Sequence, residues 1–216
     1  MLPRSFFGER GFSFFASCCI ALCVATHTGI NTMNILGISG SLRAGSYNTG
    51  LLRTAATLVP DGVTVTIASL RDIPFYDGDI DTEPQPAAVA VLKEQIANAD
   101  GVIIATPEYN YSYSGVLKNA IDWASRGTTR PFTDKPVAVI GASPGNFGAV
   151  RAQTDLRRLM FAVSGSVLPR PELLVGSVHT KINEDGIITD EATLKVYRTL
   201  LQNFIAYINH SLSRQA

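Results

Sequence analysis

The chain has 216 residues, 46% of them hydrophobic, which suits one domain of ordinary size with a full core rather than two domains. Lys and Arg total 18, as do Asp and Glu, so no overall field draws the protein toward nucleic acid or an anionic membrane surface. All three cysteines lie within residues 1–32, so the rest of the chain can form neither a disulfide nor a cysteine-based metal site, and the three histidines lack a metal-ligand spacing.

Residues 1–32 differ from the rest of the chain. Two arginines, Arg4 and Arg10, precede the apolar run Gly11–Ala25. This pattern is compatible with a secretory signal, although Glu9 beside the charged end does not suit one. The run is too short for a transmembrane helix. The competing hypothesis is that Met33 begins the protein proper and that the preceding residues arise from an upstream start codon. In both cases we expect a disordered extension at 1–32 and one folded domain at 33–216.

Apolar strand-like runs alternate with helix-like runs from Asn34 onward. The expected strands are Asn34–Ser39, Val63–Ser69, Gly101–Thr106, Pro136–Ala142 and Glu172–Val175. The expected helices are Thr49–Val59, Ala87–Asn98, Gly115–Ser125, Ala149–Ser164 and Glu191–Leu212. Regular alternation predicts a parallel sheet with right-handed crossovers, and consecutive apolar positions predict a sheet covered on both faces. We therefore predict an α/β fold: a flavodoxin-like, doubly wound, five-stranded parallel sheet in the order 2-1-3-4-5, with its switch point between strands one and three.

The loop after the first strand, Gly40–Asn48, is rich in glycine and serine and carries one arginine. Small hydroxyl residues and main-chain amides at a helix N-terminus form a phosphate site, and Arg43 adds a planar cationic fork. A capped turn with a surface arginine is the simpler explanation, but it does not account for the density of serines. The expected contacts are Ser41, Arg43, Ser46, Tyr47 and Asn48.

The type of phosphate ligand follows from what this loop lacks. Gly40 and Gly45 have the spacing of a nucleoside-triphosphate loop, but Ser46 stands where that loop needs lysine. The stretch Gly37–Gly40 fails the dinucleotide glycine pattern, and the second strand ends without an acidic residue to bind a ribose. A compact monophosphate fits better, and FMN is the obvious candidate.

The run after the third strand, Pro107–Trp123, contains aromatic and amide residues that suit a flat ring better than a core. Tyr faces and main-chain amides can border such a ring while Asn and Glu side chains fix its edge, and ligands of open α/β sheets bind beyond the strand ends. An ordinary connecting loop is the simpler alternative. The expected ring contacts are Pro107, Glu108, Tyr109, Asn110, Tyr111 and Ser112.

Several other polar features have structural explanations. Glu108 has two explanations that the sequence supports equally: a contact with the ring, or an ion pair with an arginine across a subunit contact. Lys118 and Asp122 can pair four residues apart on one helix face, and Trp123 is expected in the core. The long segment Arg71–Pro86 is expected to be a solvated acidic connector.

Three segments resemble the NADPH-dependent FMN reductase family, a flavodoxin-like group that includes quinone, azo-dye and chromate reductases. Gly40–Asn48 resembles the family's phosphate loop, Pro107–Trp123 its isoalloxazine loop, and Ser143–Gln153 its loop after strand four. The third match implies that Ser143 and Gly145 approach the ring from the loop after strand four. The resemblance extends from Met33 to Leu212.

The resemblance implies an enzyme that takes electrons from NADPH or NADH and passes them through noncovalently bound FMN to a small-molecule acceptor. Quinones, azo compounds, chromate and free flavin all fit an open ring face. The flavin carries the chemistry, so no catalytic side chain and no metal are expected. The resemblance also implies a cytoplasmic homodimer or homotetramer without nucleic-acid or stable membrane association, and cytosolic cofactors favour the upstream-start hypothesis for residues 1–32.

Two departures from the family pattern bear on substrate preference. Many relatives have proline where this chain has Ser114 and a second glycine where it has Ala149, and both changes can alter loop shape near the ring. Two other functions stay open. A flavodoxin-type electron carrier is usually strongly acidic, whereas this chain is neutral. A non-redox interaction protein would keep the fold without flavin, and the loop around Arg43 argues against it.

Overall fold

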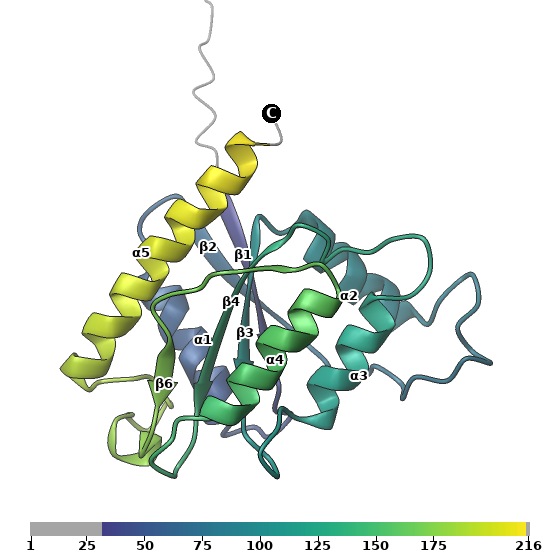
Figure 1. Cartoon of the computed structure of the whole chain (residues 1–216). Coiled ribbons are helices and arrows are strands. Elements are labelled where there is room, and N and C mark those ends of the chain that lie inside the picture. Colours follow the sequence, from purple (N-terminus) through teal and green to yellow (C-terminus); the bar gives the residue numbers. More distant parts are fainter. Residues whose placement is uncertain (1–31, 215–216) are drawn as a thin grey trace, which may run out of the picture. The chain divides into compact units, whose positions relative to one another are not determined.

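A parallel sheet lies at the centre of residues 32–214, the part of the chain that this computed structural model describes (Figure 1). Its strands are β1 (Met33–Ser39), β2 (Val63–Ala68), β3 (Gly101–Thr106), β4 (Pro136–Ala142), β5 (Ser166–Val167) and β6 (Leu173–Val175). The strand order is β2-β1-β3-β4-β5, and β6 also pairs with β4. Every pair is parallel. The predicted flavodoxin-like order 2-1-3-4-5 is therefore confirmed.

The outer edge beside β4 differs from the prediction of one strand at Glu172–Val175. Two short strands share this edge: β5, which the sequence pattern missed, pairs with the start of β4, and β6 pairs with its end. Between them the chain passes through Pro169 and Pro171, which have no N–H to donate to a ladder. A strand as short as β5 also shows no hydrophobic period by which it could be found.

Helices cover both faces of the sheet. They are α1 (Tyr47–Leu58), α2 (Ala87–Asn98), α3 (Gly115–Ala124), α4 (Val150–Ala162) and α5 (Glu191–Ser213), with a short 3-10 turn, η1 (Val178–Thr180). Figure 1 shows α1 and α5 on one face and α2, α3 and α4 on the other, and the buried side chains divide in the same way. α1 begins slightly before its predicted start because Ser46 caps it, accepting a hydrogen bond from Thr49 N at 3.2 Å. No helix within residues 32–214 is long and apolar enough to cross a membrane.

Neighbouring residues of the central strands enter opposite core layers. In β3, Ile103 and Ala105 pack with α1 and α5, whereas Val102 and Ile104 pack with the other three helices. These four side chains are 0% exposed. Because both faces are covered, the strand is an unbroken apolar run rather than an alternating one. Trp123 is also 0% exposed, as predicted for a core residue.

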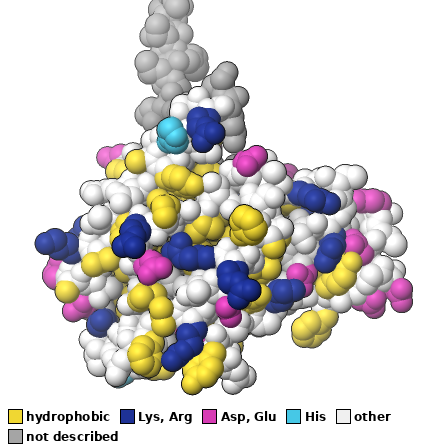
Figure 2. All heavy atoms as spheres, viewed as in Figure 1, with side chains coloured by type: hydrophobic (Ala, Val, Ile, Leu, Met, Phe, Trp, Pro, Cys, Tyr) yellow, Lys and Arg dark blue, Asp and Glu magenta, His cyan; other side chains and the backbone are white. Residues whose placement is uncertain are grey.

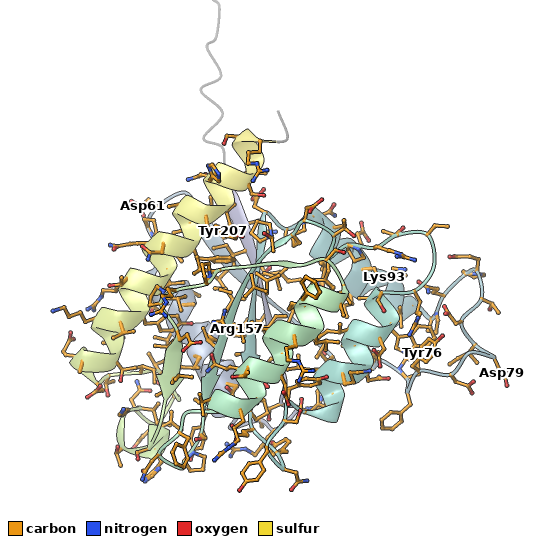
Figure 3. All side chains as sticks on the ribbon, in the orientation of Figure 1. Asp61, Tyr76, Asp79, Lys93, Arg157 and Tyr207 are labelled. Atoms are coloured by element: carbon orange, nitrogen blue, oxygen red, sulfur yellow. The ribbon has the colours of Figure 1, made fainter. Side chains whose placement is uncertain are left out.

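The connector between β2 and α2 is attached to α3 at its base. The ring of Tyr76 meets the ring of Trp123 edge-on, with 5.0 Å between centroids. The Asn119 side chain accepts a hydrogen bond from Tyr76 N and donates one to Pro74 O, both at 2.8 Å. Farther along, Asp79 points into solvent (Figure 3). The acidic tip is solvated as predicted, whereas the base of the connector is held by α3.

α1 packs closely against the turn at Gly186. A Cβ added at Gly50 would lie 2.2 Å from the carbonyl oxygen of Gly186, a main-chain atom that cannot swing away. We therefore expect Gly50→Ala to lower the free energy of unfolding by about 1–3 kcal/mol, measured by denaturant titration. Gly78→Ala is the matched control, because nothing lies within 4 Å of its added Cβ. Equal stability of the two variants would contradict this packing.

Candidate functional site

The carboxyl ends of β1 and β3 lie side by side and bring two of the predicted loops together. The two strands are paired, and Gly40 N donates to Ala105 O at 2.8 Å. A Cβ added at Gly40 would lie 2.6 Å from Leu117 Cδ1 and 2.8 Å from Pro107 Cδ. The absence of a side chain at Gly40 therefore lets the loop after β1 touch the loop after β3.

A cleft of about 330 Å³ opens where these loops meet. It is lined by Ser41, Arg43, Ser46, Tyr47, Asn48, Pro107, Glu108, Tyr109, Ala142, Ser143 and Pro144. Apart from Ala142 and Pro144, every lining residue is one of the cofactor contacts expected from the sequence. Four expected contacts lie outside this lining, namely Asn110, Tyr111, Ser112 and Gly145.

A larger cavity, of about 730 Å³, opens at the outer edge of the sheet between β6 and the start of α5. Its charged side chains are of both signs: Arg170, Glu172, Lys181 and Asp190. The smaller cleft is the better candidate, because it lies at the switch point of the sheet and combines an arginine with a helix N-terminus.

The start of α1 forms the positive end of the cleft. Within residues 32–214, the main-chain N–H groups of Tyr47 and Asn48 have no hydrogen-bond acceptor, as is usual at a helix N-terminus. The Arg43 guanidinium lies 5.1 Å from the centroid of the Tyr47 ring, and no carboxylate of the described residues forms an ion pair with it. Unpaired amides, the helix dipole and a guanidinium at one point suit a phosphate group.

Asn48 has a structural role that sequence reasoning missed. Its buried side chain donates from Nδ2 to Ala142 O at 3.2 Å and accepts at Oδ1 from Ala142 N at 3.0 Å. These two bonds join the start of α1 to the end of β4. The side chain of Asn48 is thus bonded to Ala142 at both its oxygen and its nitrogen, and its main-chain N–H has no acceptor within residues 32–214.

The ring loop contains a tight hairpin just beyond the cleft. Tyr109 N donates to Ser112 O at 2.9 Å, and Ser112 N donates to Tyr109 O at 3.0 Å. The two central residues, Asn110 and Tyr111, have φ of 51° and 68°, which defines a type I′ turn. The Ser112 hydroxyl donates to Asp155 Oδ2 on α4 at 3.0 Å. Asn110, Tyr111 and Ser112 therefore shape the loop rather than line the cleft.

Glu108 caps α4 from a distant part of the chain. Ala149 stands at the N-cap with φ of 63° and has no side-chain acceptor. Glu108 Oε2 accepts instead from Arg151 N at 3.0 Å and from Ala152 N at 3.3 Å. Its Oε1 is 3.0 Å from Arg151 Nη1 of the same chain. A carboxylate at a helix N-terminus is stabilised both by these bonds and by the helix dipole.

Within residues 32–214 Glu108 pairs with an arginine of its own chain, whereas a pair across a subunit contact stays a prediction. The partner is Arg151, within the chain. A helix start without Ser, Thr, Asp or Asn is a sequence signal that a cap must come from elsewhere, although it does not identify Glu108. The other expected ion pair is confirmed, with Lys118 Nζ 2.7 Å from Asp122 Oδ2.

The loop after β4 is held flat against the loop after β6. Ser143 N donates to Val175 O at 3.0 Å, and Ser177 N donates to Gly145 O at 2.9 Å. Gly148 has φ of 56°, and a Cβ there would lie 2.4 Å from the carbonyl carbon of Leu174. Gly145 does not line the cleft. A Cβ added there would lie 3.9 Å from Ser143 Oγ, at ordinary contact distance, so packing does not require glycine at this position. The loop thus brings Ser143 to the cleft on a rigid support.

The charged side chains that line the cleft are Arg43 and Glu108, and Glu108 is paired with Arg151. Within residues 32–214, no group of three or more His, Cys, Asp or Glu side chains could hold a metal ion. Burial raises the pKa of the Tyr197 hydroxyl and lowers the pKa of the Lys135 ammonium group, and neither residue lines the cleft.

A phosphate-type loop and a flat-ring loop on adjacent parallel strands define a flavodoxin-like protein with a site for a flat, phosphorylated cofactor. The profile of one protein family, the NADPH-dependent FMN reductases, matches residues 33–180. The chain belongs to this family.

Individual relatives agree with this assignment. An NAD(P)H-dependent FMN reductase of Pseudomonas aeruginosa is 44% identical over 170 residues, which are 79% of this chain and 92% of the relative. A quinone reductase of Escherichia coli is 41% identical over 165 residues, covering 75% of this chain and 88% of the relative. The solved structure of FerB, a flavoenzyme NAD(P)H:(acceptor) oxidoreductase of Paracoccus denitrificans, superposes with a TM-score of 0.77 at 34% identity, covering 83% of this chain and 98% of FerB.

The cap on α4 can be tested directly. We expect Glu108→Ala to lower the free energy of unfolding by about 1–2 kcal/mol, because the first amides of α4 lose their acceptor. Glu108→Gln keeps an oxygen at the same place and is expected to lose less. Denaturant titration of both variants measures the difference. Wild-type stability in Glu108→Ala would show that the cap does not contribute.

Proposed function

We propose that this protein is an NAD(P)H-dependent FMN reductase that passes electrons to quinones or similar small acceptors such as azo compounds, chromate or free flavin. The single observation that carries the proposal is the cleft at the ends of β1 and β3, in which a helix N-terminus with Arg43 faces the loop that begins at Pro107. The relatives support it, because those compared above carry the names of FMN, quinone and acceptor reductases.

The residues present fit FMN. The phosphate would lie at the start of α1, bound by the Arg43 guanidinium, the Ser41 and Ser46 hydroxyls and the unpaired N–H groups of Tyr47 and Asn48. When bound, FMN would supply the hydride and electron transfer, and the residues that line the cleft would position it.

The ring would lie between Pro107, Tyr109 and Ser143, which line the other end of the cleft. Asn110, Tyr111, Ser112 and Gly145 would contribute by holding the main chain around it. Tyr109 is 57% exposed, so this end of the cleft is open to solvent. An open side gives NAD(P)H and the acceptor access to the same place in turn.

A homo-oligomer in the cytoplasm is part of the proposal, with residues 33–216 as the working domain. Phe75 and Phe161 are each 86% exposed, and burial of such side chains would favour assembly into a homodimer or homotetramer. Figure 2 shows Lys and Arg side chains interspersed with Asp and Glu on the face in view, which gives no support to a nucleic-acid partner. A flavodoxin-type carrier is the second candidate, and NADPH turnover separates the two.

The central test is the cofactor itself. The purified protein is expected to be yellow, to release FMN on denaturation and to oxidise NADPH or NADH when a quinone is added. A chain that begins at Met33 is expected to behave in the same way. Release of FAD, or of no flavin, would contradict the proposal, and FMN without NAD(P)H oxidation would favour the carrier.

The phosphate end of the cleft gives a second test. We expect Arg43→Ala to weaken FMN binding by about 1.5–3 kcal/mol, the usual contribution of hydrogen bonds to a charged group, while the amides of α1 keep some affinity. Titration of the flavin-free protein with FMN measures the change. Arg53→Ala is the matched control, because Arg53 is an exposed arginine of α1 that does not line the cleft. Equal affinities of the two variants would place Arg43 outside the site.

A further inference from the structure

Tyr111 adopts a main-chain conformation that a tyrosine disfavours. Its φ of 68° places it in the left-handed region, at the turn position where glycine is strongly preferred. The side chain is 69% exposed, so burial does not compensate for this conformation. Strained residues of this kind concentrate at functional sites, and the strain here places an aromatic ring on the surface.

Arg151 holds that ring in a defined position. Its guanidinium carbon lies 4.3 Å from the centroid of Tyr111 and 5.1 Å from the centroid of Phe147. Glu108 fixes the guanidinium through their 3.0 Å ion pair. Phe147 is 63% exposed, like Tyr111 a large apolar side chain left in solvent. We call Tyr111, Arg151 and Phe147 the ledge.

The ledge borders the mouth of the cofactor cleft. Glu108, which anchors Arg151, lines the cleft, as do Tyr109 and Pro144 near the starts of the two loops that carry the aromatic rings. Figure 2 shows hydrophobic and basic side chains next to one another at the lower end of the molecule, below the position of α4 in Figure 1. Because Glu108 balances the charge of Arg151, the ledge presents flat faces more than net charge.

We infer that the ledge binds the planar ring system of an aromatic or quinonoid electron acceptor and so selects flat acceptors over compact ones. Tyr and Phe rings attract other flat rings by offset or edge-on stacking, whereas a compact oxyanion or metal complex has no face to stack. This inference rests on the proposed function, since the acceptor must reach FMN in the adjoining cleft.

The test uses two variants, each of which removes one aromatic ring of the ledge. Tyr111→Gly places the preferred residue in the turn and is therefore expected to fold at least as stably as the wild type. Phe147→Ser removes the second ring. Calorimetric titration of the oxidised, FMN-loaded protein with 1,4-naphthoquinone, without NADPH, is expected to show binding about three- to tenfold weaker in each variant. Tyr111→Phe keeps the ring and is expected to retain wild-type affinity.

Turnover provides an independent measure. With NADPH as donor, the ratio of kcat/KM for 1,4-naphthoquinone to that for ferricyanide is expected to fall by the same factor in Tyr111→Gly and Phe147→Ser. Val91→Ser is the matched control, because Val91 is 52% exposed on α2 and does not line the cleft. It is expected to leave both the affinity and the ratio unchanged.

The failure of this inference is distinguishable from the failure of the proposed function. If Tyr111→Gly and Phe147→Ser both kept wild-type affinity for naphthoquinone, or if their kcat/KM for ferricyanide fell by the same factor as that for naphthoquinone, the role of the ledge would be contradicted. FMN content and NADPH oxidation would remain in that case. Wild-type protein that lacks FMN, or that does not oxidise NAD(P)H, would overturn the proposed function instead.

Discussion

The contact between the first and third loops at Gly40 is the constraint on which the candidate site depends. Because β1 and β3 are parallel neighbours, their carboxyl ends lie side by side at the same end of the sheet. The loops then meet only because Gly40 leaves room for Leu117 and Pro107, which occupy the space that a Cβ would need. The positive start of α1 and the ring loop thereby face a single cleft.

A second set of contacts couples the ring loop to α4. Ala149 leaves the helix without a cap of its own, and Glu108 supplies one from the loop after β3. Ser112 bonds Asp155 one turn farther along the helix. The position of the ring loop and the integrity of the α4 N-terminus therefore depend on each other. A locally unfavourable residue, Ala149, is accommodated because a contact from a distant segment compensates for it.

The position of the cleft was predictable because it follows from topology and loop composition. Ligands bind where neighbouring parallel strands end at a switch point, and the loop around Arg43 and the loop after Pro107 have residue types that suit a phosphate and a flat ring. The role of Asn48 was not predictable. Its amide bonds Ala142, a residue 94 positions away, and nothing in the composition of either segment indicates that pairing.

Hydrophobic period and loop composition are local properties of a chain, so the residue pattern predicted the sheet order, the core position of Trp123 and two of the loops that line the cleft. The third loop, after β4, was expected only from the family resemblance. Hydrogen-bond partners are not local, because they depend on which surfaces meet after the helices pack. Only the folded chain therefore shows that Glu108 caps α4, that Asn110 and Tyr111 form a strained turn, and that the outer edge of the sheet is divided between β5 and β6.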